Sequence, residues 1–275
     1  MRLSVLLSIC RNNNRVPGKI LIQLLLFLLA SSNIFCQEDE SALKSNIISF
    51  SLASNRIKEN ILIPKVHRSH LINISYRFEN ETRNYNEFSF NTGYSKLRTK
   101  LETEKETFNI KLYLSYSWGK NLIVQEKVKY YLGLNASYNL SLMEYSVWDE
   151  SRAYWGTSLT AGPFNRLKVN LNNQCSWISS FYLGLLGILS RPDDVRLYAQ
   201  EEWKLSNIMQ ITNSNFFFGV MNNILICNFK NEYRIPLKDD NFLSVYGSVF
   251  YETISKSEGQ SLQISQITAG IGLGF

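Results

Sequence analysis

Histidine, cysteine and proline are scarce in this sequence of 275 residues, which has two, four and five of them. There is no Cys-x-x-Cys pair and no cluster of cysteine with histidine, so the sequence predicts neither a metal site nor another cofactor. Cys10 and Cys36 lie in or beside the N-terminal segment. Cys175 and Cys227 have no spacing that predicts a disulfide, and the sequence leaves open whether they pair.

Long apolar runs are also missing. After the N-terminal segment no run reaches the length of about 18 residues that a membrane-spanning helix needs, which excludes a helical multi-span protein. A composition of 45% apolar and 13% aromatic residues excludes a disordered chain. The net charge of +6 is concentrated at the start: residues 1–36 hold four basic residues and no acid, and the rest has 25 basic and 23 acidic residues. We therefore expect no nucleic-acid partner.

Residues 1–36 predict a secretory signal peptide. The polar, basic stretch 11–19 precedes the apolar sequence ILIQLLLFLLA of residues 20–30, which is too short to span a bilayer comfortably. Cleavage after Cys36 would leave Gln37 first, a layout that resembles signal peptides of the Bacteroidota. Lipidation of Cys36 is the alternative, against which the bulky Phe35 argues. Residues 37–44 would then form a short periplasmic segment.

The last ten residues, 266–275, alternate strictly between two kinds of side chain. Every second residue is apolar: Phe275, Leu273, Ile271, Ala269 and Ile267. The residues between them are small or polar: Gly274, Gly272, Gly270, Thr268 and Gln266. Successive strand residues face opposite sides of a sheet, so this is a strand with one apolar and one polar face. Similar alternation recurs through residues 45–275, in segments of about ten residues or more, as tilted transmembrane strands require.

A closing strand that ends on an aromatic residue resembles that of bacterial outer-membrane β-barrels. The resemblance implies an all-β, antiparallel, up-and-down transmembrane barrel over residues 45–275, located in the outer membrane of a Gram-negative bacterium of Bacteroidota type. It also implies that Phe275, Leu273 and Ile271 form the recognition signal for the barrel-assembly machinery. A soluble barrel or sandwich with one solvated face would alternate as well, but the strand lengths, Phe275 and the signal peptide favour the membrane.

We count ten strands, an even number as bacterial barrels require. Twelve is the alternative, obtained by splitting residues 167–189 and taking 195–212 as a strand. Residues 191–213 alternate poorly and predict a long external loop or a plug in the lumen. Short turns are expected near Gly119–Asn121 and at Glu79–Asn84, Pro163–Arg166 and Lys238–Asn241, with longer links at Asn55–Lys65 and elsewhere at the opposite end.

The polar faces predict the residues that line the lumen: Arg77, Lys111, Tyr113, Lys129, Tyr131 and Asn135. Eight strands leave a lumen that side chains fill, and only about 16 leave a wide channel. A general porin is therefore excluded. A structural, binding or narrow-passage role without catalysis is the main hypothesis, and the lumen size, ligand and oligomeric state stay open.

A hydrolase is the alternative function. An outer-membrane phospholipase needs a serine beside a histidine, and His67 and Ser69 share a face of their strand, with His70 next to them. A protease would need acidic residues at the rim, where Asp193 and Asp194 fall. The asparagine and glycine that follow the serine in the phospholipase family are absent. Expected partners are outer-membrane lipid and lipopolysaccharide, the barrel-assembly machinery through the C-terminal strand, and a larger membrane complex as a further candidate.

Overall fold

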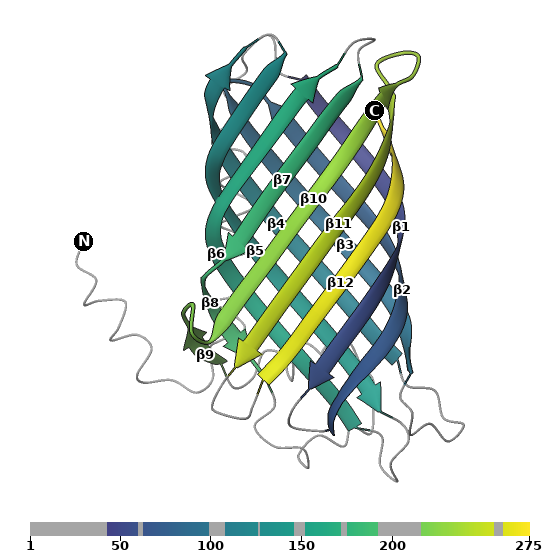
Figure 1. Cartoon of the computed structure of the whole chain (residues 1–275), viewed down its shortest axis with the longest axis vertical. Coiled ribbons are helices and arrows are strands. Elements are labelled where there is room, and N and C mark those ends of the chain that lie inside the picture. The colour runs from purple at the N-terminus through teal and green to yellow at the C-terminus, as the bar shows by residue number, and fades with distance from the viewer. Residues whose placement is uncertain are drawn as a thin grey trace, which may run out of the picture.

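The computed structural model is a barrel of tilted strands (Figure 1). The residues that it describes are 43–59, 63–98, 108–125, 127–145, 152–171, 175–191, 216–255 and 261–275. The signal peptide, the residues around Cys36 and most of the expected loop or plug at 191–213 lie outside these ranges. No helix in the described part of the chain is long and apolar enough to cross a membrane.

All the regular structure described is β-strand. The strands are β1 (Leu43–Glu59), β2 (Ile63–Glu81), β3 (Asn84–Arg98), β4 (Phe108–Val124), β5 (Val128–Tyr145), β6 (Arg152–Asn170), β7 (Ser176–Gly184), β8 (Leu186–Ser190), β9 (Phe216–Gly219), β10 (Ile224–Pro236), β11 (Phe242–Ser255) and β12 (Ser261–Gly274).

Ten of these strands close into a ring in which every neighbour is antiparallel. Around the ring the order is β1 to β7, then β10, β11, β12 and back to β1, with the short strands β8 and β9 added beside β6. The seam is the pairing of β1 with β12, which runs from Ile47↔Gly274 to Glu59↔Leu262. Phe275 extends it through two backbone hydrogen bonds with Asn46, of 2.9 and 2.8 Å. The all-β barrel of ten strands is thus confirmed.

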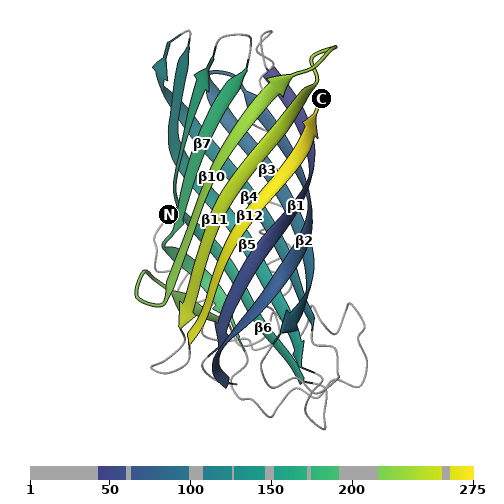
Figure 2. The ribbon, with the colours of Figure 1, turned by 45° about the vertical axis from the view of Figure 1, so that its right-hand side comes forward.

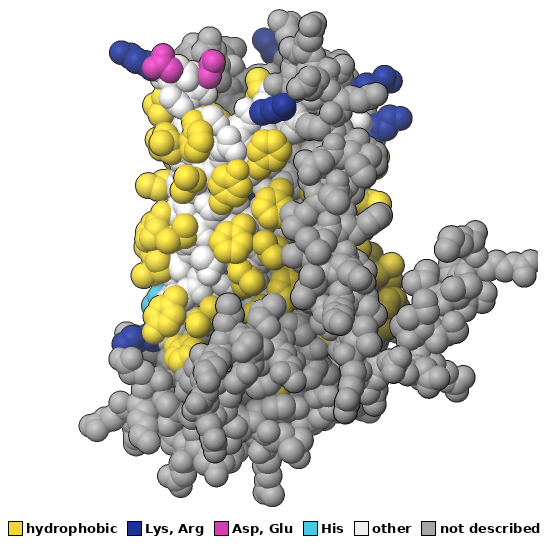
Figure 3. All heavy atoms as spheres, turned by 180° about the vertical axis from the view of Figure 1, so that it is seen from behind, with side chains coloured by type: hydrophobic (Ala, Val, Ile, Leu, Met, Phe, Trp, Pro, Cys, Tyr) yellow, Lys and Arg dark blue, Asp and Glu magenta, His cyan; other side chains and the backbone are white. Residues whose placement is uncertain are grey.

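The expected alternation places the apolar residues on the outside. Ile48, Phe50 and Leu52 are each about half exposed, whereas the intervening Ser49 and Ser51 are buried in the lumen. The same holds at the end of the chain, where Ile271, Leu273 and Phe275 face outward. Hydrophobic side chains form a broad band on the outer face, with charged side chains gathered above it (Figure 3).

The two ends of the barrel differ, and the charged rim of Figure 3 belongs to the one that we call the turn end. It carries the described short turns at 82–83 and 238–241 together with the C-terminus, and the opposite end is called the far end (Figure 2). The predicted turn Lys238–Asn241 is confirmed, with left-handed backbone at Asp239 (φ 57°) and Asp240 (φ 60°). Acidic residues tolerate this conformation in tight turns.

Two predicted turns are wrong, because both stretches are strand. β4 continues through residues 119–121 to Val124, and β6 continues through 163–166 to Asn170. The link expected at residues 55–65 is likewise mostly strand, since β1 reaches Glu59 and β2 begins at Ile63. Glycine and proline are typical of turns, but Gly119 and Pro163 lie within strands.

A β-bulge explains why a proline fits inside β6. Between the pairs Phe164↔Tyr182 and Ala161↔Leu186, two residues of β6 face three residues at the junction of β7 and β8. Pro163, which lacks a backbone donor, lies at this interruption of the ladder, as strand prolines commonly do. At Gly162 a Cβ atom would lie 1.8 Å from the carbonyl oxygen of Leu183, so a side chain is excluded there.

A charge placed in the middle of the outer band should destabilise the barrel. Ile74 is 57% exposed and lies opposite Phe50. We expect Ile74→Arg to reduce the free energy of unfolding in phospholipid vesicles by about 2–4 kcal/mol, because it places a cation in hydrocarbon. Leu237→Arg is the matched control beyond the turn end of β10, and should cost about 0–1 kcal/mol. Urea titration measures both, and equal losses would contradict a membrane-embedded band.

Candidate functional site

The candidate site is the lumen, which side chains from opposite walls fill at three levels. In a ring of ten strands, opposite strands are five steps apart. Contacts between strands four or five steps apart therefore cross the lumen. Such contacts occur near the turn end, at mid-height and near the far end, and we call these levels the charged layer, the middle layer and the apolar layer.

The charged layer is organised around two glutamates. Glu79 on β2 accepts from Arg234 on β10 at 2.8 Å and forms an ion pair at 3.2 Å with Arg166 on β6. Glu232 on β10 contacts the Arg77 guanidinium of β2 at 2.7 Å and that of Arg234 at 2.7 Å. β2 is four steps from both β6 and β10 around the ring, so the bonds from Arg77 and Glu79 to those strands cross the lumen.

Further ion pairs extend this layer toward the turns. Glu81 binds both Lys129 and Lys168 at 2.9 Å. The Arg166 guanidinium lies 4.2 Å from the ring centroid of Tyr85 and donates a 2.8 Å hydrogen bond to its hydroxyl. Tyr85 in turn packs against Tyr131, and against Phe164 with their ring centroids 5.9 Å apart.

Burial makes the loss of any one partner from this network costly. The side chains of Arg166, Glu79 and Glu232 are at most 2% exposed. An isolated buried charge is costly, whereas a paired and hydrogen-bonded one is tolerated. Within the described residues the ion pairs join six basic side chains to four glutamates, which gives the layer a positive excess.

In the middle layer, an aromatic contact and a hydrogen bond to an amide join opposite walls of the lumen. Tyr113 on β4 meets Phe250 on β11, five steps away, edge to face with ring centroids 6.4 Å apart. Beside it the Lys111 ammonium donates a 3.0 Å hydrogen bond to Gln266 on β12 and lies 5.4 Å from the Phe250 ring centroid.

A cavity of about 170 Å³ lies around the middle layer. Its lining is mostly hydroxyl and amide side chains. Asn135 donates a 2.7 Å hydrogen bond to Ser117, and both residues line the cavity. The cavity reaches Arg77 on the charged layer and Glu252 on the other side, so it lies between the two outer levels.

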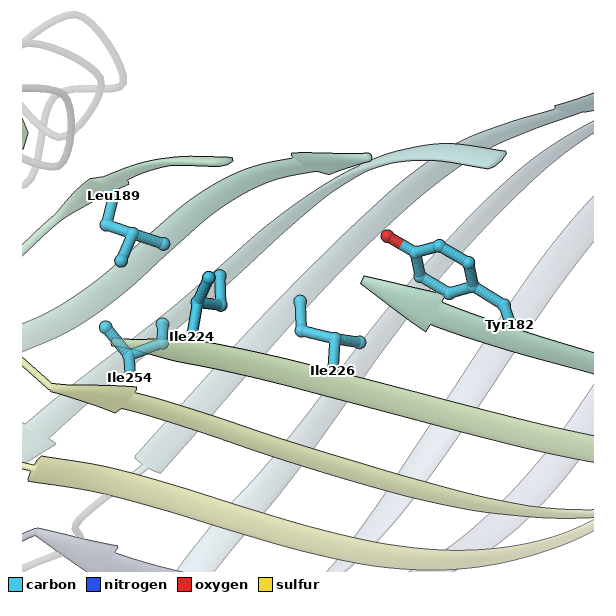
Figure 4. Packing of buried hydrophobic residues seen from close by; sticks show 5 residues of the cluster. All are labelled: Tyr182, Leu189, Ile224, Ile226 and Ile254. Carbon is cyan, nitrogen blue, oxygen red and sulfur yellow. The ribbon is translucent and has the colours of Figure 1, made fainter. Parts of the chain in front are cut away.

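The apolar layer fills the far end of the lumen. Met143 on β5 packs with Leu262 and Ile264 on β12, five steps away, and with Ile57 on β1. A second cluster, of Tyr182, Leu189, Ile224, Ile226 and Ile254, joins strands β7, β8, β10 and β11, and its side chains converge in Figure 4. Phe250 packs against both clusters and connects them to the middle layer.

The residues predicted to line the lumen are distributed over these levels. Arg77, Lys129 and Tyr131 belong to the charged layer, while Lys111, Tyr113 and Asn135 surround the cavity. The residues that the sequence analysis missed are the acids and arginines that hold the layer together: Glu79, Arg166, Glu232 and Arg234. A signal existed, because Arg77 with Glu79, Arg166 with Lys168 and Glu232 with Arg234 are each two residues apart and share a face.

The residues of the hydrolase hypothesis are not all on one side of the wall. His67 and Ser69 are buried on the inward face of β2, whereas His70 is exposed on the outward face. Asp193 and Asp194 lie outside the described residues. Within the described part of the chain, no group of three or more His, Cys, Asp or Glu residues could hold a metal ion.

The two cysteines that could have paired lie at opposite ends of the barrel. Cys175 precedes Ser176, which faces Arg234 near the turn end, and Cys227 faces Leu183 and Tyr251 toward the far end. Seven residues of β10 separate these levels, or roughly 23 Å of strand, far beyond disulfide reach. Both are free thiols.

The chain was compared with known families, sequences and solved structures. No family model and no curated protein sequence matches the chain. Among solved structures it is similar to the outer membrane protease OmpT of Escherichia coli, with 8% identity, a TM-score of 0.49 and coverage of 86% of this chain and 96% of that one. The translocator domain of the autotransporter NalP from Neisseria meningitidis gives 9% identity, a TM-score of 0.43 and coverage of 94% and 96%. The attachment protein Ail of Yersinia pestis gives 15% identity, a TM-score of 0.36 and coverage of 84% of this chain and 98% of that one.

These neighbours are bacterial outer-membrane β-barrels, and at such low identity the likeness concerns the fold alone. The chain's own strand pairings establish a closed antiparallel barrel.

Removal of one carboxylate from the charged layer should destabilise the fold. Glu79→Gln leaves Arg77, Arg166 and Arg234 with one acid fewer among them, and we expect a loss of about 3–5 kcal/mol in the free energy of unfolding. Glu87→Gln is the control, because Glu87 is more exposed and lies 3.8 Å from Arg166. Its loss should be clearly smaller. Urea unfolding in vesicles measures both, and an equal effect would show that the network does not depend on Glu79.

Proposed function

We propose that this protein is an integral outer-membrane barrel whose lumen does not conduct solutes, and that its role is structural or binding, performed by its surfaces. The observation that carries the proposal is the set of side-chain contacts between opposite strands at three levels of the lumen. Catalysis has no part in this role. Residues 1–36 would direct secretion, and Phe275 with Leu273 and Ile271 would be read by the assembly machinery.

The outer face supports the placement in a membrane. A closed ring leaves no unpaired strand edge, which is the condition for a β-structure in hydrocarbon. The half-exposed Ile48, Phe50, Leu52, Ile72 and Ile74 lie side by side on β1 and β2. A continuous apolar surface of this kind would be a liability in water, and it matches the band of a transmembrane barrel.

The contents of the lumen support closure. A solute would have to break ion pairs at Glu79 and Glu232, separate Tyr113 from Phe250, and part Met143 from Leu262. A narrow passage, which the sequence left open, would need a route around all three levels. The 170 Å³ cavity is lined by residues of the charged and middle layers, so it lies beside these contacts.

Among the described residues the hydrolase hypothesis is supported only by the shared inward face of His67 and Ser69, since His70 faces outward. Its test remains the double variant His67→Ala, His70→Ala with fluorogenic lipid and peptide substrates. Loss of an activity present in the unmodified protein would favour it over a surface role.

The closed lumen predicts the electrical behaviour. We expect the refolded protein, inserted into a planar bilayer, to give no stable conductance steps, because the charged, middle and apolar layers each block the path. Insertion is verified independently by the heat-dependent gel mobility of folded barrels. Regular steps in the unmodified protein would contradict the proposal.

A widened variant provides the control for that measurement. It removes contacts at all three levels and keeps the net charge, because two basic and two acidic residues are replaced. The substitutions are Arg77→Ser, Glu79→Ser, Glu232→Ser, Arg234→Ser, Met143→Ala and Phe250→Ala. We expect this variant to conduct if it folds. Circular dichroism and gel mobility determine whether it has folded, so that silence of a folded variant counts against the assignment of the barrier to these layers.

A further inference from the structure

Two arginines lie side by side on the outer surface at the far end of β1 and β2. Arg56 on β1 is directly opposite Arg68 on β2, and Arg68 is directly opposite Arg98 on β3. The Arg56 and Arg68 side chains are exposed and outward. In an antiparallel sheet, opposite residues on one face have Cβ atoms roughly 5 Å apart, so the two guanidinium groups share one small area.

More cationic and polar side chains lie next to this pair, closer to the middle of the barrel. His70 is exposed, faces outward and lies opposite Ser54, and Lys96 is exposed two residues before Arg98. We call Arg56, Arg68, His70 and Lys96 the arginine patch. The next outward positions are apolar: Leu52 lies opposite Ile72, and Ile72 opposite Tyr94. The patch therefore borders directly on the hydrophobic band.

Among the described residues, no acidic side chain lies beside Arg56 or Arg68 on the outward face of these strands. The outward positions of β1, β2 and β3 between Lys44 and Lys58, Val66 and Asn80, and Asn84 and Lys96 contain no Asp or Glu. Neither Arg56 nor Arg68 forms an ion pair or a side-chain hydrogen bond with another described residue. Like charges placed opposite each other on a sheet destabilise it, so a counterion from outside the chain would stabilise this surface.

We propose that the arginine patch binds the phosphate groups of anionic lipid in the membrane leaflet around the far end. Guanidinium groups bind phosphate in bidentate fashion, and the phosphates of a leaflet lie at the edge of its hydrocarbon, where the patch lies on the barrel. The apolar row of Leu52, Ile72 and Tyr94 below the patch offers a surface for an acyl chain. This continuity identifies lipid, rather than free phosphate, as the ligand. The inference rests on the proposed membrane placement.

The test compares binding of a phosphorylated lipid by variants that differ only in surface charge. The refolded protein is placed in phosphatidylcholine nanodiscs, and fluorescently labelled lipid A, a glycolipid with two phosphates, is titrated at fixed ionic strength. We expect Arg56→Gln, Arg68→Gln to weaken binding by roughly 30-fold, the effect of two cations near a membrane surface. Arg56→Lys, Arg68→Lys keeps the charge and should recover most of it.

A matched control removes two outward cations at the other end of the barrel. Lys44 and Lys120 are exposed near the turn end, and Lys44→Gln, Lys120→Gln should leave binding unchanged. Equal weakening by the two Gln variants, or none by the arginine variant, would overturn the proposal. So would full displacement of lipid A by inorganic phosphate at the same ionic strength, which would indicate a general anion site.

Failure of the membrane placement gives a different result. If the protein does not insert into phosphatidylcholine nanodiscs, as judged by heat-dependent gel mobility, then the proposed function has failed, and the patch falls with it. If the protein inserts and stays non-conducting but the variants bind lipid A alike, then only the patch assignment has failed.

Discussion

The constraint on which the structure depends is the closure of ten strands into one ring. Closure pairs the backbone of β1 with that of β12 and leaves no edge, which makes an apolar outer surface permissible. The same circumference brings opposite walls within side-chain reach of each other. Inward positions must then be filled by residues that fit one another, and the crossing contacts at three levels are the consequence. A wider ring would have permitted a water-filled lumen with the same alternation.

The charged layer and the apolar layer contribute to the fold in different ways. A buried ion pair adds little net stability over an apolar filling of equal volume, but it penalises any arrangement that separates the partners. A slip of one residue in the register of β2 would move Arg77 and Glu79 to the outer face. Glu232 and Arg234 would lose their partners on β2 at the same time. The charged layer thus favours one register around the ring, whereas the apolar layer mainly fills space.

The strands that the sequence predicted well are those whose two faces differ most in polarity. In β1, β2 and β12 every second side chain is apolar through the band, and the outward assignment of Phe50, Ile74 and Ile271 agrees with the structure. The failures have a local cause. Pro163 and the residues around Gly119 are typical turn signals, and only the neighbouring strands reveal that one lies at a β-bulge and that the other is inside β4.

The crossing contacts could not be predicted from alternation, which assigns a face but no partner. Glu79 is 155 residues from Arg234 in the sequence, and their contact requires the ring order and the stagger of all the strands between them. The apolar layer was missed for a related reason. Ile57, Leu262 and Ile264 occupy inward positions, where the sequence predicted the polar face of each strand. Filling of the far end reverses that rule.

The fold itself does not require the cations on the outer face. Closure and lumen filling use the backbone and the inward side chains. Ser54 and Ser265 occupy outward positions next to Arg56, so the fold accommodates uncharged residues on this part of the face. At the turn end the exposed lysines stand near the acidic turn residues Asp239 and Asp240, so charges of both signs occur there. On the outward face at the far end of β1–β3 only positive charge is found. Arg56 and Arg68 oppose folding where they face each other, beside a band that carries no charge, and the proposed lipid phosphate would relieve that repulsion.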